Sequence, residues 1–200
     1  MDDSKIRLSE EEWQLVQNSA WILTKHAVID KVYHLFGQLA QCMQLELEQP
    51  HQLPPEVLRH SPKISKGEQY ERMPWVVLDY PRCFGREDVL AIRTFFWWGH
   101  YFSSTLHLKG IYRQAFGPKL EQLAAAGKLD GYYCCAGGAE FDFDVRGKGY
   151  TLLEGQSAAL TNAANSPFIK LALTHSLEEW DEAQEKLLEA FTAFIRMLAR

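Results

Sequence analysis

Residues 66–108 constrain the fold most, because charged residues are embedded there among closely spaced apolar and aromatic ones. Three parts of this segment, residues 74–81, 89–98 and 99–108, are rich in β-branched and aromatic residues and are predicted to be strands. In the second of them both alternating sets of side chains are largely apolar. A strand buried on both faces predicts a sheet that is covered on each side by helices or loops.

Helical patterns lie on both sides of this segment. Ser9 and Glu12 form an S-x-x-E capping box that predicts a short first helix. Apolar residues then recur at helical spacing from about residue 21 to 48, which predicts one long N-terminal helix. A second capping box, Ser176 with Glu179, precedes a predicted C-terminal helix.

The remaining elements complete the predicted order. A helix is expected near residues 112–123, and further strands at residues 132–136, 141–145, 150–153 and 168–174. Helices, antiparallel strands, a helix, strands and a last helix follow one another along the chain. This order predicts one α+β domain over residues 1–200, with an antiparallel sheet packed between the long N-terminal helix and the C-terminal helix.

Composition limits the class of partner. Two hundred residues with 46% hydrophobic and 12% aromatic content are enough for one substantial core. A net charge of -5 gives no broad positive field, so we expect no nucleic-acid partner. The sequence has no cationic leader followed by an apolar run and no apolar stretch of membrane-spanning length, so we expect no membrane partner. Four cysteines without paired spacing are typical of a reduced, cytoplasmic protein.

The first candidate site is an anion site around Arg93. Its strand neighbours are mostly apolar, and a buried guanidinium needs a carboxylate partner or a bound anion. Asp79 on the preceding strand could supply that carboxylate, so a structural ion pair is the alternative. In the anion hypothesis two arginines hold the ligand, a tyrosine and a histidine bond to it, and an acidic residue orients an arginine. The candidate ligand-binding residues are Lys66, Glu68, Tyr70, Asp79, Arg82, Arg93 and His100.

Histidines and carboxylates offer a second candidate site. His100 and His107 are seven residues apart and fall on opposite faces of a regular strand, which argues against a shared metal. Glu140, Asp142 and Asp144 alternate along a predicted strand, as metal ligands or as an ordinary solvated face. The corresponding function is a metal-dependent hydrolase for a phosphorylated small molecule, with Asp142 and Asp144 holding the ion and His107 as general base.

Seven aromatic residues cannot all lie on one face of the predicted sheet. Core packing is the default interpretation, and an exposed part would form a stacking pocket or a homodimer interface. A purely structural, dimerising protein is therefore a third alternative. The seven are Trp75, Phe95, Phe96, Trp97, Trp98, Tyr101 and Phe102.

The motif ISKGEQYERMPWVVLDYPRCFGREDVLAIRTFFWWGHYFSSTLHL resembles a segment of a family of small uncharacterised bacterial proteins of about this length. The resemblance implies a helix, buried strands, and a C-terminal strand followed by a helix, and it assigns no catalytic residue. Phosphate-loop, Rossmann, zincin, EF-hand and kinase motifs do not occur. The sequence thus favours a small-anion-binding or protein-interaction domain and leaves open whether it catalyses a reaction or uses a cofactor.

Overall fold

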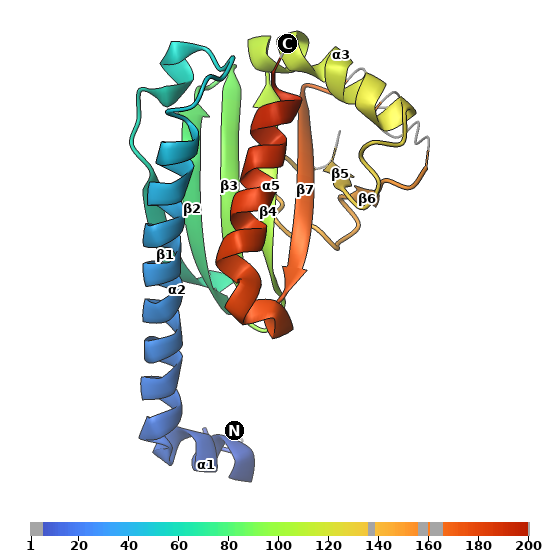
Figure 1. The fold of residues 1–200 in the computed structure, drawn as a ribbon. Coiled ribbons are helices and arrows are strands. Elements are labelled where there is room, and N and C mark those ends of the chain that lie inside the picture. Colours follow the sequence, from blue (N-terminus) through green and yellow to red (C-terminus); the bar gives the residue numbers. More distant parts are fainter. Residues whose placement is uncertain (1–5, 136–138, 156–159, 161–165, 200) are drawn as a thin grey trace.

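One antiparallel sheet organises the described part of the chain (Figure 1). The computed structural model describes residues 6–135, 139–155, 160 and 166–199. Within them seven strands pair in the order β1-β2-β3-β4-β7-β5-β6. Their bounds are β1 Lys63–Tyr70, β2 Met73–Phe84, β3 Val89–Trp97, β4 Tyr101–Lys109, β5 Tyr133–Cys135, β6 Thr151–Leu152 and β7 Phe168–Ser176.

The helices follow the capping signals of the sequence. Both predicted capping boxes are present, at Ser9 before α1 and at Ser176 before a 3-10 turn that leads into α5. The bounds of the α-helices are α1 Glu10–Gln17, α2 Ser19–Glu46, α3 Ile111–Ala125 and α5 Ala183–Met197. Short 3-10 helices cover Pro55–Leu58 and Leu177–Glu182. The α+β class, the antiparallel sheet and the two helices packed on it are confirmed.

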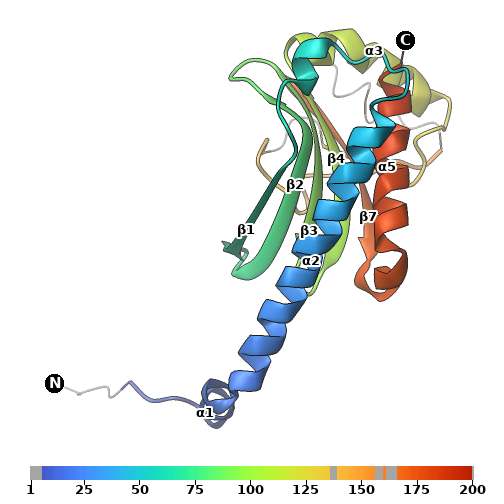
Figure 2. The ribbon, with the colours of Figure 1, turned by 60° about the vertical axis from the view of Figure 1, so that its left-hand side comes forward.

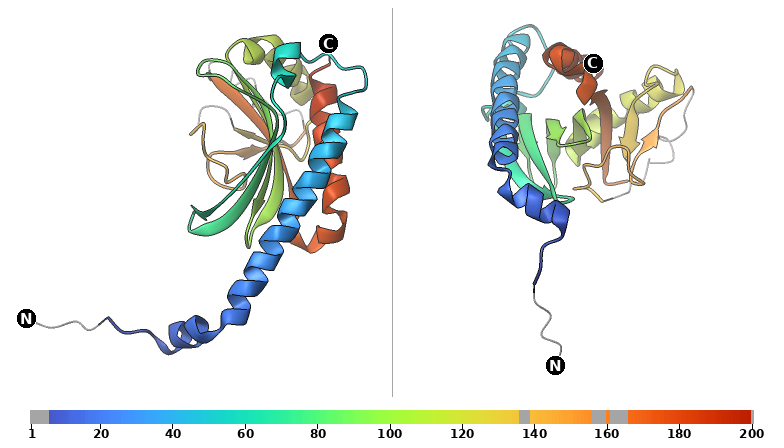
Figure 3. Two further views of the ribbon diagram at one scale, coloured as in Figure 1. Left: turned by 90° about the vertical axis from the view of Figure 1, so that its left-hand side faces the viewer. Right: turned by 90° about the horizontal axis from the view of Figure 1, so that it is seen from below.

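The sheet has two differently covered faces. On the first, which we call the helix face, α2 and α5 lie side by side and bury Phe36, Phe96, Phe102 and Phe191 (Figure 3). The second, which we call the loop face, is covered by residues 139–150 and buries a smaller aromatic cluster. Because β3 is buried on both faces, its two alternating apolar sets serve the two layers, as its composition predicts. The seven predicted aromatics are divided between these faces.

The predicted strand at residues 141–145 is wrong. Acidic and apolar side chains alternate in this segment, but the segment does not pair with a strand of the sheet. This segment consists of turns and irregular backbone. Asp142 and Asp144 each accept a hydrogen bond from the backbone N–H two residues further on, at 2.9 and 3.2 Å. Such local bonds compete with a strand ladder for the backbone. The acidic stripe on one strand face therefore does not exist.

Helix α1 and the first turns of α2 extend beyond the sheet (Figure 2). No residue of α1 is buried, and the first turns of α2 are exposed. Several large apolar side chains are exposed here, namely Trp13, Leu15, Val16, Trp21, Ile22 and Leu23. None of the described helices combines the length and the apolar character needed to cross a bilayer.

Candidate functional site

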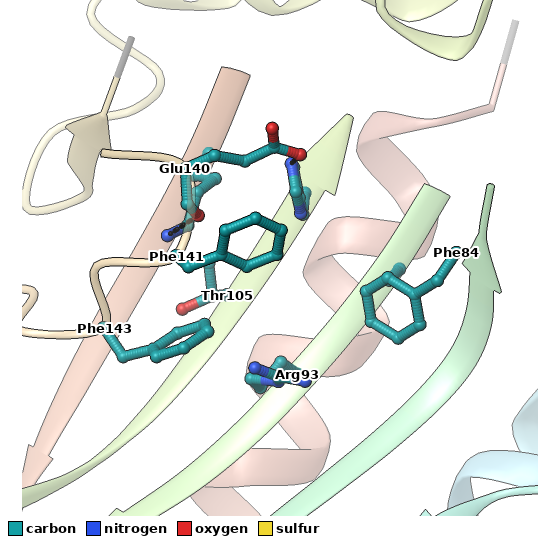
Figure 4. Close-up of a pocket in the computed structure, with 9 residues that line it drawn as sticks. Phe84, Arg93, Thr105, Glu140, Phe141 and Phe143 are labelled. Carbon is teal, nitrogen blue, oxygen red and sulfur yellow. Dashed lines mark hydrogen bonds and ion pairs between the residues drawn. The ribbon is translucent and has the colours of Figure 1, made fainter. Parts of the chain in front are cut away.

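Two adjoining cavities lie on the loop face and share Arg93 and Phe143. The first, which we call the Lys170 pocket, has a volume of about 260 Å³. It is lined by Phe84, Ala91, Arg93, Thr105, His107, Glu140, Phe141, Phe143 and Lys170 (Figure 4). The second, which we call the Tyr70 pocket, has a volume of about 360 Å³. It is lined by Gly67, Glu68, Gln69, Tyr70, Trp75, Val77, Arg93, Phe95 and Phe143.

The strand register explains why the polar lining residues meet. Ala91, His107 and Lys170 are directly opposite one another on β3, β4 and β7. Arg93 is opposite Thr105, two residues along the same strands and so on the same face. The pairing of three central strands thus gathers ionisable groups on the loop face, where residues 139–150 cover them.

Arg93 and Asp79 form the ion pair that the hairpin register predicts. Arg93 Nε and Nη2 donate to the two carboxylate oxygens at 2.7 and 2.9 Å, with 24% of the arginine side chain and 9% of the aspartate side chain exposed. The guanidinium also lies 4.6 Å from the ring centroid of Phe143 and 5.7 Å from that of Phe84. The guanidinium of Arg93 has five N–H donors, and Asp79 accepts from two of them. The other edge of the guanidinium, which lines both pockets, is left for a ligand.

Lys170 is the most deeply buried ionisable group of the site, with 1% of the residue exposed. Its Nζ donates to the backbone carbonyls of Glu140, at 3.1 Å, and Asp142. The ring centroids of Phe143 and Tyr150 lie 4.9 and 5.2 Å from Nζ. No carboxylate of the described residues forms an ion pair with it. Burial, the largest cause, lowers the pKa of Lys170 to about 8.

Glu140 joins two basic residues at the edge of the Lys170 pocket. Its carboxylate lies 3.3 Å from His107 Nε2 and accepts a hydrogen bond from Lys109 at 3.0 Å. Burial, with the charge of Lys170 as the next cause, lowers the pKa of His107 to about 4. The imidazole is therefore neutral near pH 7. Arg93, Lys109 and Lys170 then lie near the carboxylates of Asp79 and Glu140, and the charge of Asp142 also acts on Lys170.

Two tyrosines hold the segment that covers the pocket. Tyr70 on β1 donates to Asp142 Oδ1 and accepts from the Phe143 N–H, at 3.1 and 2.9 Å. Tyr101 on β4 repeats this with Asp144 and the Val145 N–H, at 3.0 and 2.9 Å. Burial, the first cause, raises the pKa of Tyr70 to about 12, so its hydroxyl keeps its proton and its donor role at neutral pH.

Asp142 and Asp144, the two proposed metal ligands, thus bond to different tyrosines and to their own backbone. Among the described residues no group of three or more His, Cys, Asp or Glu could hold a metal ion. His107, the general base of that hypothesis, lies in the Lys170 pocket.

The seven predicted ligand-binding residues are only partly together. Arg93, Glu68 and Tyr70 line the Tyr70 pocket, and Asp79 bonds to Arg93. The other three point elsewhere. Arg82 donates to the Ser61 carbonyl at 2.7 Å, Lys66 lies 3.8 Å from Asp30, and His100 stacks on Trp97 at 3.6 Å.

Sequence reasoning missed Lys170 and the three phenylalanines of the Lys170 pocket, and it considered Glu140 only as part of an acidic stripe. Lys170 did carry a signal, because it lies between Phe168 and Ala172 on one face of a strand whose other face is apolar. An ionisable residue between apolar same-face neighbours is the pattern that drew attention to Arg93.

Comparisons of the chain with protein-family models, with curated proteins and with solved structures found no match.

Proposed function

We propose that this protein binds a small organic anion in the Lys170 pocket, with the anionic group near Arg93 and Lys170 and an apolar part among the phenylalanines. The observation that supports this most is Lys170, a buried cation that lines a cavity and has no ion-paired carboxylate among the described residues. A buried charge is normally paired, and a ligand anion would supply the missing partner.

The lining also fits this class of ligand. A volume of about 260 Å³ lies just below the usual range for ligand pockets, which favours a compact molecule. Phe84, Phe141 and Phe143 border the space next to Arg93 (Figure 4). Apolar walls with a few converging polar groups are typical of small-molecule sites. Arg93 offers a planar, two-pronged donor edge suited to a carboxylate or phosphate.

Thermal unfolding with a panel of carboxylates and phosphates tests the proposal. A ligand at a hundred times its dissociation constant stabilises the folded state by about 2.7 kcal/mol. The shift should disappear in Lys170→Met, with each variant compared with its own unliganded midpoint. Lys66→Met is the matched control, because Lys66 lies outside the pocket. A shift that survives in Lys170→Met, or none with any anion, contradicts the proposal.

A further inference from the structure

We infer that Lys170 is a carbonyl-binding amine, whose Nζ forms an imine with an oxo carboxylic acid bound in the Lys170 pocket. This inference rests on the proposed function and specifies its ligand class as a small acid that also carries a ketone or aldehyde. Four features of the described residues support it: the orientation of the amine, its apolar surroundings, the nearby arginine, and the acid–base groups on the same pocket.

The hydrogen bonds of Lys170 suit a neutral amine. Its Nζ has two backbone acceptors among the described residues, the carbonyls of Glu140 and Asp142. A neutral amine has two N–H groups and one lone pair, whereas an ammonium has three N–H groups and no lone pair. The two carbonyls can therefore satisfy both hydrogens of the neutral form and fix the nitrogen. Neither of these two bonds uses the lone pair, which is the part of the amine that attacks a carbonyl carbon.

The surroundings favour loss of the proton. Lys170 is almost fully buried, and the rings of Phe143 and Tyr150 lie about 5 Å from Nζ. Desolvation penalises the ammonium and lowers its pKa to about 8, so about a tenth of the groups are neutral amines at pH 7. Lysines that form imines in other proteins are activated in this way, by burial or by a neighbouring cation.

Arg93 supplies a carboxylate site near this amine. Arg93 Cζ and Lys170 Nζ lie 4.6 and 4.9 Å from the same Phe143 ring centroid, and both residues line the pocket. A small molecule can thus contact both. Arg93 would bind the carboxylate through the edge that Asp79 does not use, while the carbonyl carbon faces Lys170.

The reaction is balanced without an oxidant or reductant. Nζ attacks the carbonyl carbon to give a carbinolamine, and the former carbonyl oxygen leaves as water with the two hydrogens of the amine. One C=O bond is lost and one C=N bond is formed. Glu140 and the neutral His107 line the same pocket and can exchange the protons that this step moves.

Reductive trapping tests the inference. The protein is incubated with phenylpyruvate, a 2-oxo acid, or levulinate, a 4-oxo acid, in the presence of sodium cyanoborohydride, and intact and peptide masses are measured. We expect one adduct per chain, on Lys170, formed at least tenfold faster than on surface lysines. Lys170→Arg should abolish it. 3-Phenyllactate, which has the carboxylate but no carbonyl, should protect Lys170 in the unaltered protein, a result that needs no variant.

Arg93→Lys distinguishes the acid from a simple carbonyl compound. It should slow trapping of the two oxo acids about tenfold more than trapping of 3-phenylpropanal, an aldehyde without a carboxylate. A 3-phenyllactate melting shift without any Lys170 adduct overturns the imine and leaves the proposed function standing. A second outcome is an adduct on Lys170 whose rate does not depend on Arg93, without any melting shift from 3-phenyllactate. That outcome overturns both the acid class and the proposed anion site.

Discussion

Removing the Arg93 side chain should destabilise the fold through Asp79. In Arg93→Ala the aspartate loses both charge-assisted hydrogen bonds while its side chain stays largely buried. Breaking a buried ion pair on one side typically costs about 3–5 kcal/mol. Because 24% of the Arg93 side chain is exposed and a cavity adjoins it, we expect the lower end, about 3 kcal/mol. For a chain of this length that corresponds to a fall in Tm of about 6–12 °C.

Urea unfolding followed by tryptophan fluorescence measures this free energy. A double-mutant cycle with Asp79→Ala should show positive coupling, because the second substitution removes the carboxylate that the first leaves unpaired. Arg86→Ala is the matched control, since 96% of the Arg86 side chain is exposed, and it should change stability by less than about 0.5 kcal/mol. If Arg93→Ala is no less stable than Arg86→Ala, the ion pair does not contribute to the fold and this reasoning is wrong.

Three further predictions concern titration and the covering segment. His107 has a pKa of about 4 in the folded state against 6.5 for the free group. The free energy of unfolding should therefore fall by about 3 kcal/mol as the pH drops from 6.5 to 4. In urea titrations at a series of pH values, His107→Gln should lack this fall. Lys170 has a pKa of about 8 in the folded state against 10.5 for the free group, so it loses its proton at a lower pH when the chain is folded. The free energy of unfolding should therefore rise from pH 8 to 10, and Lys170→Met should not show this rise. Tyr101→Phe removes the hydrogen bonds to Asp144 and Val145 and should lower the free energy of unfolding by about 1–3 kcal/mol. It should also accelerate hydrogen exchange at the Val145 amide. Unchanged exchange there would contradict the anchoring role of Tyr101.

Local patterns predicted most elements well. The capping boxes at Ser9 and Ser176 mark the starts of helical segments, and the apolar repeat predicts both ends of α2 to about two residues. The predicted strand at residues 89–98 agrees with β3 to one residue. These signals are local because hydrogen-bond caps and side-chain periodicity depend on residues a few positions apart.

Alternation was misleading at residues 141–145. The same sequence pattern can arise from a half-exposed strand or from turns in which aspartates bond to their own backbone, and Asp142 and Asp144 are in turns. Which outcome occurs depends on whether a partner strand is available. Here Tyr70 and Tyr101, from strands distant in sequence, take the place of such a partner.

The sequence by itself determined most of the elements and the α+β class, and it made Asp79 a candidate partner of Arg93, because a hairpin brings nearby residues together in a register that alternation constrains. Only the tertiary structure decided the pocket. Lys170 reaches it through the pairing of β4 with β7, and Glu140 and Phe143 reach it through a segment without regular structure. Contacts between such distant segments depend on chain topology and packing, which no local periodicity encodes.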